Sequence, residues 1–403
     1  MSAPREIVVV GASLAGLRAV ETLRERGHDG RLTLVGAETH EPYDRPPLSK
    51  QLLVEGWAPE RLALRKDGYA ALALDLRLGR RATALDARAR RVTLDDGSTL
   101  SYDGLVIATG ASPRTLPGAT GMHGVHVLRT LDDALALRVA FSHKPRVAVI
   151  GAGFIGLEVA SSCRKLGLEV SVIEMAPVPL AHALDANVGE AIARMHRDQG
   201  VALRLGVGVT ALETGADGRV VALTLSDGTR VATDVVVAGI GVVPETHWLD
   251  GSGIALDRGI VCDATLATNL PGVVAAGDVA RWPNALFDET MRVEHWSNAV
   301  EQGRAAAMRL LLGSASDLGA TPFVPVPYFW SDQYDVKLQF AGHLRPGDDS
   351  AVVEGSLSER MFVVRYGRAG RLCGVLTCNR PQALARDRKL IANRAAFETA
   401  LPS

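Results

Sequence analysis

Apolar runs that end in a glycine-rich turn occur twice along the chain, each time followed by a helical pattern. The first run, Glu6 to Val10, has the composition of a short buried strand, and Arg31 to Val35 has that of a second strand. Between them, apolar residues recur every three to four positions, which predicts a helix. The turn before this helix consists of Gly11, Ala12, Ser13, Leu14, Ala15 and Gly16. This order predicts one βαβ unit of a parallel sheet.

The same order returns 140 residues later. Arg146 to Ile150 and Glu169 to Glu174 have strand patterns, with a helical stretch to Leu166 between them. The turn of this second copy consists of Gly151, Ala152, Gly153, Phe154, Ile155 and Gly156. The repeat extends further. Each copy continues with Leu-Arg-Leu-Gly, at 76–79 and 203–206, and then with an Asp-Gly hairpin signal. Each copy ends in an apolar strand and a glycine turn, at 105–110 and 235–241. The chain is therefore predicted to be α/β, with two Rossmann-like units.

The glycine spacing of both turns is typical of a dinucleotide site. The first glycine permits the tight turn after the strand, the second lets the backbone approach a pyrophosphate, and the third lets the helix pack closely on the strand. The phosphates would then lie on free N–H groups at the helix N-terminus. In the first copy Ser13 replaces the middle glycine, which slightly crowds that approach. Two such units predict two bound dinucleotides.

The acidic residue after each second strand helps to identify the nucleotide. Glu174 ends its strand 18 residues after Gly156, where a carboxylate can accept a hydrogen bond from an adenosine ribose and repel a 2′-phosphate. The residues that follow supply no arginine, so the second unit is expected to prefer NADH to NADPH. In the first unit the candidate is Glu38, 22 residues after Gly16, for which a solvated turn carboxylate is the alternative interpretation.

The copies differ in length, and the C-terminal part differs from both. The first copy has 13 additional residues before its Leu-Arg-Leu-Gly segment, and this interval contains the Pro-rich stretch Pro42 to Lys50 with two cations. We interpret it as a functional insertion. From residue 323 onward, short alternating segments such as Phe362 to Tyr366 and Leu372 to Thr377 predict an antiparallel sheet. This part carries a net charge of +3, against −4 for residues 1–322.

Composition narrows the class of protein. The 403 residues include 44 basic and 45 acidic side chains, so there is no overall field to hold nucleic acid or an anionic membrane. The N-terminal apolar run is too short for an export signal, and the longest one, Val235 to Val243, is too short to span a bilayer. We expect a cytoplasmic protein. The four cysteines have no metal-site spacing and are interpreted as reduced packing thiols.

Several segments taken together resemble one enzyme family. They are Pro42 to Lys50, Ala108-Thr109-Gly110, Arg129-Thr130, Gly151 to Glu158, Ala276-Gly277-Asp278, Arg292 to Trp296 and Phe329-Trp330-Ser331-Asp332. The chain resembles, over essentially its whole length, the FAD-dependent NADH:ferredoxin reductases of the putidaredoxin reductase-like type. These serve bacterial ring-hydroxylating dioxygenases and haem monooxygenases, and rubredoxin reductases and apoptosis-inducing factor are their relatives.

The resemblance implies FAD in the first unit, NADH in the second, and a C-terminal α+β domain that closes over the flavin, as in the glutathione-reductase-like architecture. The implied boundaries are 1–112 with 242–322 for the FAD-binding domain, 113–241 for the NAD-binding domain and 323–403 for the last domain. FAD would contact the first glycine turn, Glu38, Arg45, Lys50, Ala82, Arg129, Asp278, His295, Trp296 and Trp330. NADH would contact Gly151, Gly153, Ile155, Gly156, Glu158, Glu174 and Gly241.

The resemblance also implies that Lys50 and Glu158 are catalytic and lie near flavin N5. An ammonium there would stabilise the negative charge of the reduced flavin. Residues 1–162 contain no cysteine, so the internal disulfide or sulfenic acid used by other enzymes of this architecture is excluded. The acceptor is therefore expected to be external. The resemblance implies that it is a [2Fe-2S] ferredoxin, and we expect the chain to be a monomer or a weak dimer.

Other interpretations stay open at this point. Glu158 could be a carboxylate favoured by the helix dipole, Lys50 a surface lysine, and either tryptophan ordinary interdomain packing. The basic C-terminal part could be no more than a solvated face. Rubredoxin could replace ferredoxin as the acceptor, and a redox-sensing flavoprotein like apoptosis-inducing factor is the alternative from another class.

Overall fold

The computed structural model describes residues 4–313 and 319–398, which form two compact units. Unit 1 comprises the described residues of 1–44, 63–112 and 243–329, and unit 2 those of 45–62, 113–242 and 330–403. The chain thus passes between the units several times, and β8 (Ala111–Pro113) and β17 (Val242–Pro244) pair with each other at two of these passages. The three-domain division expected from the sequence stays a prediction.

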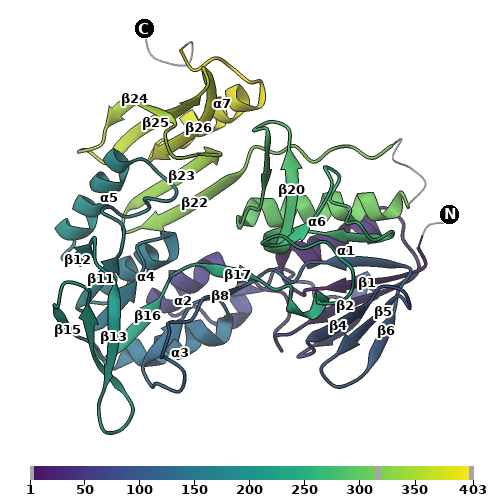
Figure 1. Cartoon of the computed structure of the whole chain (residues 1–403), viewed down its shortest axis with the longest axis horizontal. Coiled ribbons are helices and arrows are strands. Elements are labelled where there is room, and N and C mark those ends of the chain that lie inside the picture. The colour runs from purple at the N-terminus through teal and green to yellow at the C-terminus, as the bar shows by residue number, and fades with distance from the viewer. Residues whose placement is uncertain (1–3, 314–318, 399–403) are drawn as a thin grey trace. The chain divides into compact units, whose positions relative to one another are not determined.

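Unit 1 is built on a parallel sheet whose central strand is β1 (Glu6–Val10) (Figure 1). The strand order is β19-β7-β1-β2-β3, with β2 (Arg31–Gly36), β3 (Asp75–Leu78), β7 (Gly104–Ile107) and β19 (Val273–Ala275). The helices α1 (Leu14–Glu25) and α6 (Trp296–Leu311) pack against each other and contact this sheet. Leu17, Val20 and Leu23, which predicted the first helix, are all fully buried on α1.

Smaller elements complete unit 1. An antiparallel sheet consists of β4 (Ala82–Asp86), β5 (Arg91–Leu94) and β6 (Thr99–Ser101), with the predicted Asp-Gly turn between the last two. A second group consists of β18 (Ile260–Val261), β20 (Ala280–Asn284) and β21 (Glu289–Met291). Short 3-10 helices are η3 (Ala70–Leu72), η4 (His247–Leu249) and η5 (Gly277–Val279).

Unit 2 contains a second parallel sheet with the same plan. Its order is β12-β11-β10-β16-β9, with β9 (Val125–Val127), β10 (Val147–Ile150), β11 (Val170–Glu174), β12 (Ala202–Leu205) and β16 (Val235–Ala238). It is accompanied by α3 (Leu131–Ser142), α4 (Phe154–Lys165) and α5 (Ala186–Asp198), and by an antiparallel sheet of β13 (Val209–Thr214), β14 (Val220–Leu225) and β15 (Arg230–Ala232). In both units the fifth strand, β19 or β9, comes from outside the repeat.

The Pro-rich insertion of the first repeat does not stay with that repeat. From residue 45 it belongs to unit 2, where it forms η1 (Pro46–Ser49), α2 (Gln51–Val54) and η2 (Pro59–Leu62). η1 contacts α3 and α4, and α2 contacts the same two helices. The insertion therefore brings its side chains to the helix that begins at the second glycine turn.

The C-terminal part of unit 2 is a five-stranded sheet in the order β22-β23-β26-β25-β24. Its strands are β22 (Tyr328–Gln333), β23 (Val336–Gly342), β24 (Asp349–Ser356), β25 (Met361–Arg368) and β26 (Arg371–Cys378). The pairs β23–β26, β26–β25 and β25–β24 are antiparallel, and α7 (Pro381–Ala392) contacts β23 and β26 (Figure 1). The predicted fold class, two Rossmann-like units and a C-terminal α+β part, is confirmed. Within the described residues, no helix is both long enough and apolar enough to cross a bilayer.

Candidate nucleotide sites and a buried ion pair

The first glycine turn lies at the carboxyl end of β1 and leads into α1. A methyl group at Gly11 would collide with the carbonyl of Ala108, and one at Gly16 would collide with the carbonyl of Gly11 itself. Gly11 also has a φ of +121°. Ser13 is the N-cap residue of α1 in extended conformation. Sterics therefore require the first and third glycines, whereas the middle position accepts a side chain.

The second glycine turn repeats this arrangement at the end of β10. A methyl group at Gly151 would collide with the carbonyl of Gly239, and one at Gly156 with the carbonyl of Gly151. At Gly153, the N-cap residue of α4, the nearest atom to an added methyl group is 3.9 Å away, on His182. The middle glycine is thus not needed for packing within the chain, and the open space beside it at a helix N-terminus suits a phosphate.

The carboxylates that follow the second strands have different partners. Glu38 accepts a hydrogen bond from the hydroxyl of Tyr43 at 2.5 Å. Glu174 accepts from the backbone N–H of Ala152 at 2.7 Å and from that of Ala176 at 2.8 Å. The side chain of Glu174 therefore joins the glycine turn to the end of β11 and fixes the position of a charge there.

Other expected FAD residues of unit 1 gather around the end of β19 and the start of α6. Asp278 lies in η5, directly after Gly277, whose N–H donates to Oε1 of Gln302 at 2.8 Å. Trp296 begins α6 and donates its indole N–H to Asp44 at 2.7 Å. His295 is the N-cap residue of α6, and its ring lies 4.9 Å from that of Phe329. Ala82 is buried in β4.

The remaining expected FAD residues, Arg45, Lys50, Arg129 and Trp330, belong to unit 2. Arg45 donates from Nη1 to the backbone carbonyl of Arg129 at 2.5 Å, so these two cations are neighbours. Trp330 lies in β22. Of the expected NADH residues, Ile155 is in the first turn of α4 with 48% of its surface exposed, and Gly241 lies after β16 with a φ of +95°.

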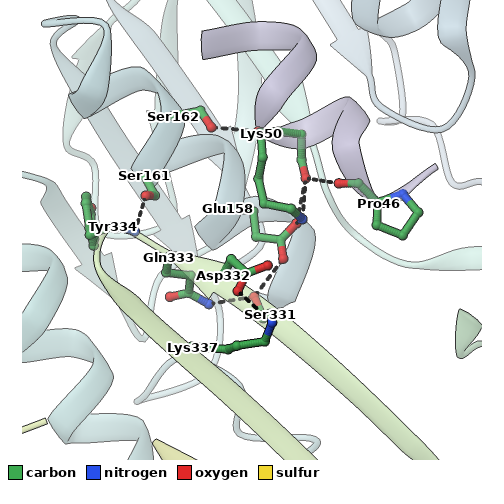
Figure 2. A network of polar contacts seen from close by, with 11 residues as sticks. Pro46, Lys50, Glu158, Ser161, Ser162, Ser331, Asp332, Gln333, Tyr334 and Lys337 are labelled. Carbon is green, nitrogen blue, oxygen red and sulfur yellow. Dashed lines mark hydrogen bonds and ion pairs between the residues drawn. The ribbon is translucent and has the colours of Figure 1, made fainter. Parts of the chain in front are cut away.

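Lys50 and Glu158 form a buried ion pair (Figure 2). Nζ of Lys50 lies 2.7 Å from Oε2 of Glu158, and their side chains are 14% and 4% exposed. The hydroxyl of Ser49 donates to the same oxygen at 2.6 Å, and that of Ser331 donates to Oε1 at 2.8 Å. Both oxygens of the carboxylate are therefore held, one by the insertion and the other by β22.

The resemblance placed Lys50 and Glu158 together, and they lie together in the structure, whereas Ser49 and Ser331 were not identified as site residues. Their only sequence signal was their place beside Lys50 and Trp330 in segments that carried the resemblance. Ser162 was also missed, and its hydroxyl donates to the carbonyl of Ser49 at 2.6 Å. Serine is too common for spacing alone to single out such contacts.

The cysteines support the exclusion of internal thiol chemistry. Cys163, Cys262, Cys373 and Cys378 are all free and buried. Burial raises the pKa of each thiol to about 12. Because the thiolate is the reactive form, these residues have neither the pairing nor the ionisation that a redox cysteine requires.

Two family models match the chain. Residues 5–303 match the family described as pyridine nucleotide-disulphide oxidoreductase, and residues 328–401 match the domain described as reductase C-terminal. The second match covers the separate C-terminal sheet found in the structure.

Individual relatives are similar over almost the whole chain. Putidaredoxin reductase CamA of Pseudomonas putida is 38% identical over 99% of this chain and 94% of its own length. The ferredoxin–NAD(+) reductase component of the anthranilate 1,2-dioxygenase system of Burkholderia cepacia is 39% identical over 96% of this chain and 93% of its own. A chain in the crystal structure of the covalent putidaredoxin reductase–putidaredoxin complex superposes with a TM-score of 0.91 and 37% identity, covering 97% of this chain and 93% of that chain.

Proposed function

This chain belongs to the pyridine nucleotide-disulphide oxidoreductases, among the ferredoxin–NAD(+) reductases of oxygenase systems, and we propose that it passes electrons from NADH through FAD to a [2Fe-2S] ferredoxin. The family depends on FAD and a pyridine nucleotide. The observation that carries the proposal is the pair of glycine turns, each with two sterically required glycines and a middle position that is the N-cap residue of a helix. One turn would serve each nucleotide.

Unit 1 has features that fit FAD. Gln302 is fully buried, and its amide nitrogen has no hydrogen-bond partner among the described residues, although its oxygen accepts from Gly277. A buried donor without a partner is costly, so a ligand oxygen would satisfy it. Asp278 follows Gly277 in the chain, and its carboxylate could accept hydrogen bonds from ribityl hydroxyls. When bound, FAD would supply the conversion of a two-electron hydride into single electrons, which nicotinamide cannot perform.

Unit 2 has features that fit NADH. The open position at Gly153 would admit the pyrophosphate, and α4 would direct its N-terminal N–H groups to it. Two backbone N–H groups hold the carboxylate of Glu174 at the end of β11, so its negative charge would stay close to the ribose of a bound adenosine. A 2′-phosphate at that position would meet a fixed negative charge, which favours NADH over NADPH.

Lys50 and Glu158 would act at the reacting atoms. Lys50 would place a positive charge, in a mostly buried setting, where negative charge develops as hydride arrives. Glu158 would hold the ammonium in place, and Ser49 and Ser331 would hold the carboxylate. None of these four side chains needs to gain or lose a proton for this role.

The acceptor would be an external one-electron carrier. The four cysteines are unpaired and buried, so the chain has no internal disulfide to reduce. A relative was crystallised as a covalent complex with putidaredoxin, which supports a ferredoxin as the partner. The net charge of +3 in residues 323–403 would favour encounter with an acidic protein.

The test begins with the absorption spectrum of the purified protein and continues with an assay of electron transfer from NADH to cytochrome c. We expect a yellow protein with one non-covalent FAD and cytochrome c reduction that depends on an added [2Fe-2S] ferredoxin. Rubredoxin in its place is the matched alternative acceptor. A protein that binds no flavin after reconstitution, or that reduces rubredoxin but not ferredoxin, would contradict the proposal. Slow turnover with every acceptor would instead indicate a redox sensor.

A further inference from the structure

A line of buried polar side chains continues from Glu158 through β22 to α5. Figure 2 shows its first part, from Glu158 to Ser331 and Gln333. Ser331 Oγ lies 2.8 Å from Glu158 Oε1, and Gln333 Nε2 lies 3.1 Å from Ser331 Oγ. Gln333 Oε1 lies 2.9 Å from Nε2 of His196, and His196 Nδ1 lies 2.9 Å from the hydroxyl of Tyr334. Ser331, Gln333 and His196 are completely buried. We call Ser331, Gln333, His196 and Tyr334 the positioning chain.

Hydrogen-bond chemistry fixes the direction of every bond in this chain. An ionised carboxylate can only accept hydrogen bonds, so the hydroxyl of Ser331 must donate its one proton to Glu158. Ser331 can then only accept from Gln333, which must turn its amide nitrogen to the serine and its oxygen to His196. His196 must therefore carry its proton on Nε2, and its bare Nδ1 accepts from Tyr334. Every donor points toward Glu158.

The far end of the chain is held firmly. Tyr334 has a φ of +56°, which is uncommon for a bulky residue. Its backbone N–H donates to Ser161 at 2.7 Å, and its carbonyl accepts from Nζ of Lys165 at 3.0 Å, so α4 keeps the turn in this conformation. Burial lowers the pKa of His196 to about 4, so the imidazole is neutral at neutral pH, as the donor pattern requires.

The chain is suited to orientation and not to proton transfer. The Gln333 amide stands in its middle, and an amide does not readily take up a proton on one side and release it on the other. Its bonds instead restrict the rotation of Ser331, and through it that of the Glu158 carboxylate. The ion pair with Lys50 is thus braced on one side by the insertion and on the other by the C-terminal sheet.

We propose that Ser331, Gln333, His196 and Tyr334 are positioning residues that align Glu158, and through it Lys50, for hydride transfer. This inference rests on the proposed function of the ion pair. It gives the C-terminal sheet a part in the chemistry of the reductive step, through a line of contacts that ends on the carboxylate.

The test compares variants of the FAD-loaded, full-length protein by anaerobic stopped-flow reduction over a range of NADH concentrations. Ser331→Ala removes the donor to Glu158, Gln333→Leu breaks the middle of the chain, and Ser331→Thr restores a hydroxyl. The matched control is Thr377→Val, because Thr377 is a fully buried residue of the same sheet whose hydroxyl has no partner among the described residues. Tyr334→Phe removes only the hydrogen bond to His196 at the far end of the positioning chain, and it serves as the test variant if Ser331→Ala and Gln333→Leu fold poorly.

We expect the limiting rate of flavin reduction to fall about tenfold in Ser331→Ala, which is the size of a lost hydrogen bond to a charged group. The apparent dissociation constant for NADH should not change, and Ser331→Thr should recover much of the rate. Gln333→Leu combined with Ser331→Ala should be no slower than Ser331→Ala alone, because the chain acts only through Ser331. Nitrogen NMR of the histidines should show His196 as the Nε2–H tautomer in the unmodified protein and a mixture in Tyr334→Phe.

Rates in Ser331→Ala and Gln333→Leu equal to that of Thr377→Val would overturn the inference, as would an Nδ1–H tautomer of His196. A wild-type flavin that NADH does not reduce would instead overturn the proposed function. The two failures are distinguishable because the first requires a working reductase and the tautomer is read without turnover.

Discussion

The two glycine turns share their steric logic and differ in the residues that a nucleotide would meet. In both, the first and third glycines are required because a methyl group would strike a backbone carbonyl. The middle position is Ser13 in one turn and Gly153 in the other, and each is the N-cap residue of a 12-residue helix. The first and third glycines are thus required by the fold, whereas the middle position differs between the two turns.

The carboxylates that follow the second strand of each copy also differ in their hydrogen-bond partners. Glu38 is hydrogen-bonded to a tyrosine of the same segment, whereas Glu174 is held by two backbone N–H groups, one of them within its own glycine turn. The first copy alone carries the insertion, and the insertion belongs to the other unit, where Lys50 meets Glu158. The two copies therefore share one backbone plan and differ in the contacts of their carboxylates and in the insertion.

The largest expected effect separates required from free glycines. Gly156→Ala should lower the free energy of unfolding by about 3 kcal/mol, because the added methyl group would collide with the Gly151 carbonyl. Gly153→Ala, with 3.9 Å of space, should change it by less than about 0.5 kcal/mol. Urea unfolding followed by circular dichroism measures both. Equal midpoints for the two variants would show that the steric distinction is wrong.

Acid should reveal the buried histidine of unit 2. The pKa of His196 is about 4 in the folded chain because burial disfavours its charged form, against 6.5 when exposed. Between these values the unfolded chain binds a proton that the folded chain does not, so stability falls as pH falls. From pH 7.5 to pH 5 the loss should be about 2 kcal/mol.

Urea unfolding at both pH values checks this, with His196→Gln expected to lack that loss. The control is His247→Gln, because the His247 side chain is 89% exposed. The prediction fails if the two variants respond to acid alike.

Lys50 comes from the insertion, which only the first copy has. Lys50→Met should lower the flavin midpoint potential by ~30 mV, equivalent to ~1.4 kcal/mol for a two-electron couple, and slow reduction by NADH while FAD stays bound. A redox titration and stopped-flow reduction measure the two effects. Lys66→Met, at an exposed lysine, is the control. An unchanged potential and rate at full flavin occupancy would make Lys50 a structural lysine only.

Glu174 should have an effect of similar size, on the choice of nucleotide. NADH should be preferred over NADPH by at least roughly tenfold in kcat/KM, or ~1.4 kcal/mol, and Glu174→Arg should narrow this preference. Because Glu174 also holds Ala152, the variant should raise the KM for NADH as well. Steady-state kinetics with NADH and with NADPH measure both effects. Equal kcat/KM values for the two nucleotides in the unmodified enzyme would contradict the role proposed for Glu174.

The internal repeat and the spacing of apolar residues were enough to predict the two parallel sheets and the order of their first elements. Strand β1 has the predicted bounds, and the second copy follows the order of the first because its glycines have the same backbone constraints. The Lys50–Glu158 contact came from a family resemblance. The positioning chain could not be predicted, because His196, Ser331 and Gln333 are common residues far apart in sequence. They meet only in the folded chain, where His196 on α5 is hydrogen-bonded to Gln333 on β22, and no local sequence pattern predicts that contact.

If the first glycine turn holds FAD and the second holds NADH, as we propose, a negative charge placed in each turn should have a different effect. Aspartate is a favoured N-cap residue, so Ser13→Asp and Gly153→Asp should both fold, while each places a negative charge in the path of a pyrophosphate. The decisive measurement is the flavin content of each purified variant, followed by the NADH concentration needed to reduce the bound flavin. We expect Ser13→Asp to lose flavin, and Gly153→Asp to keep it but to need far more NADH for its reduction. Loss of flavin in Gly153→Asp, or full flavin content in Ser13→Asp, would contradict the proposal.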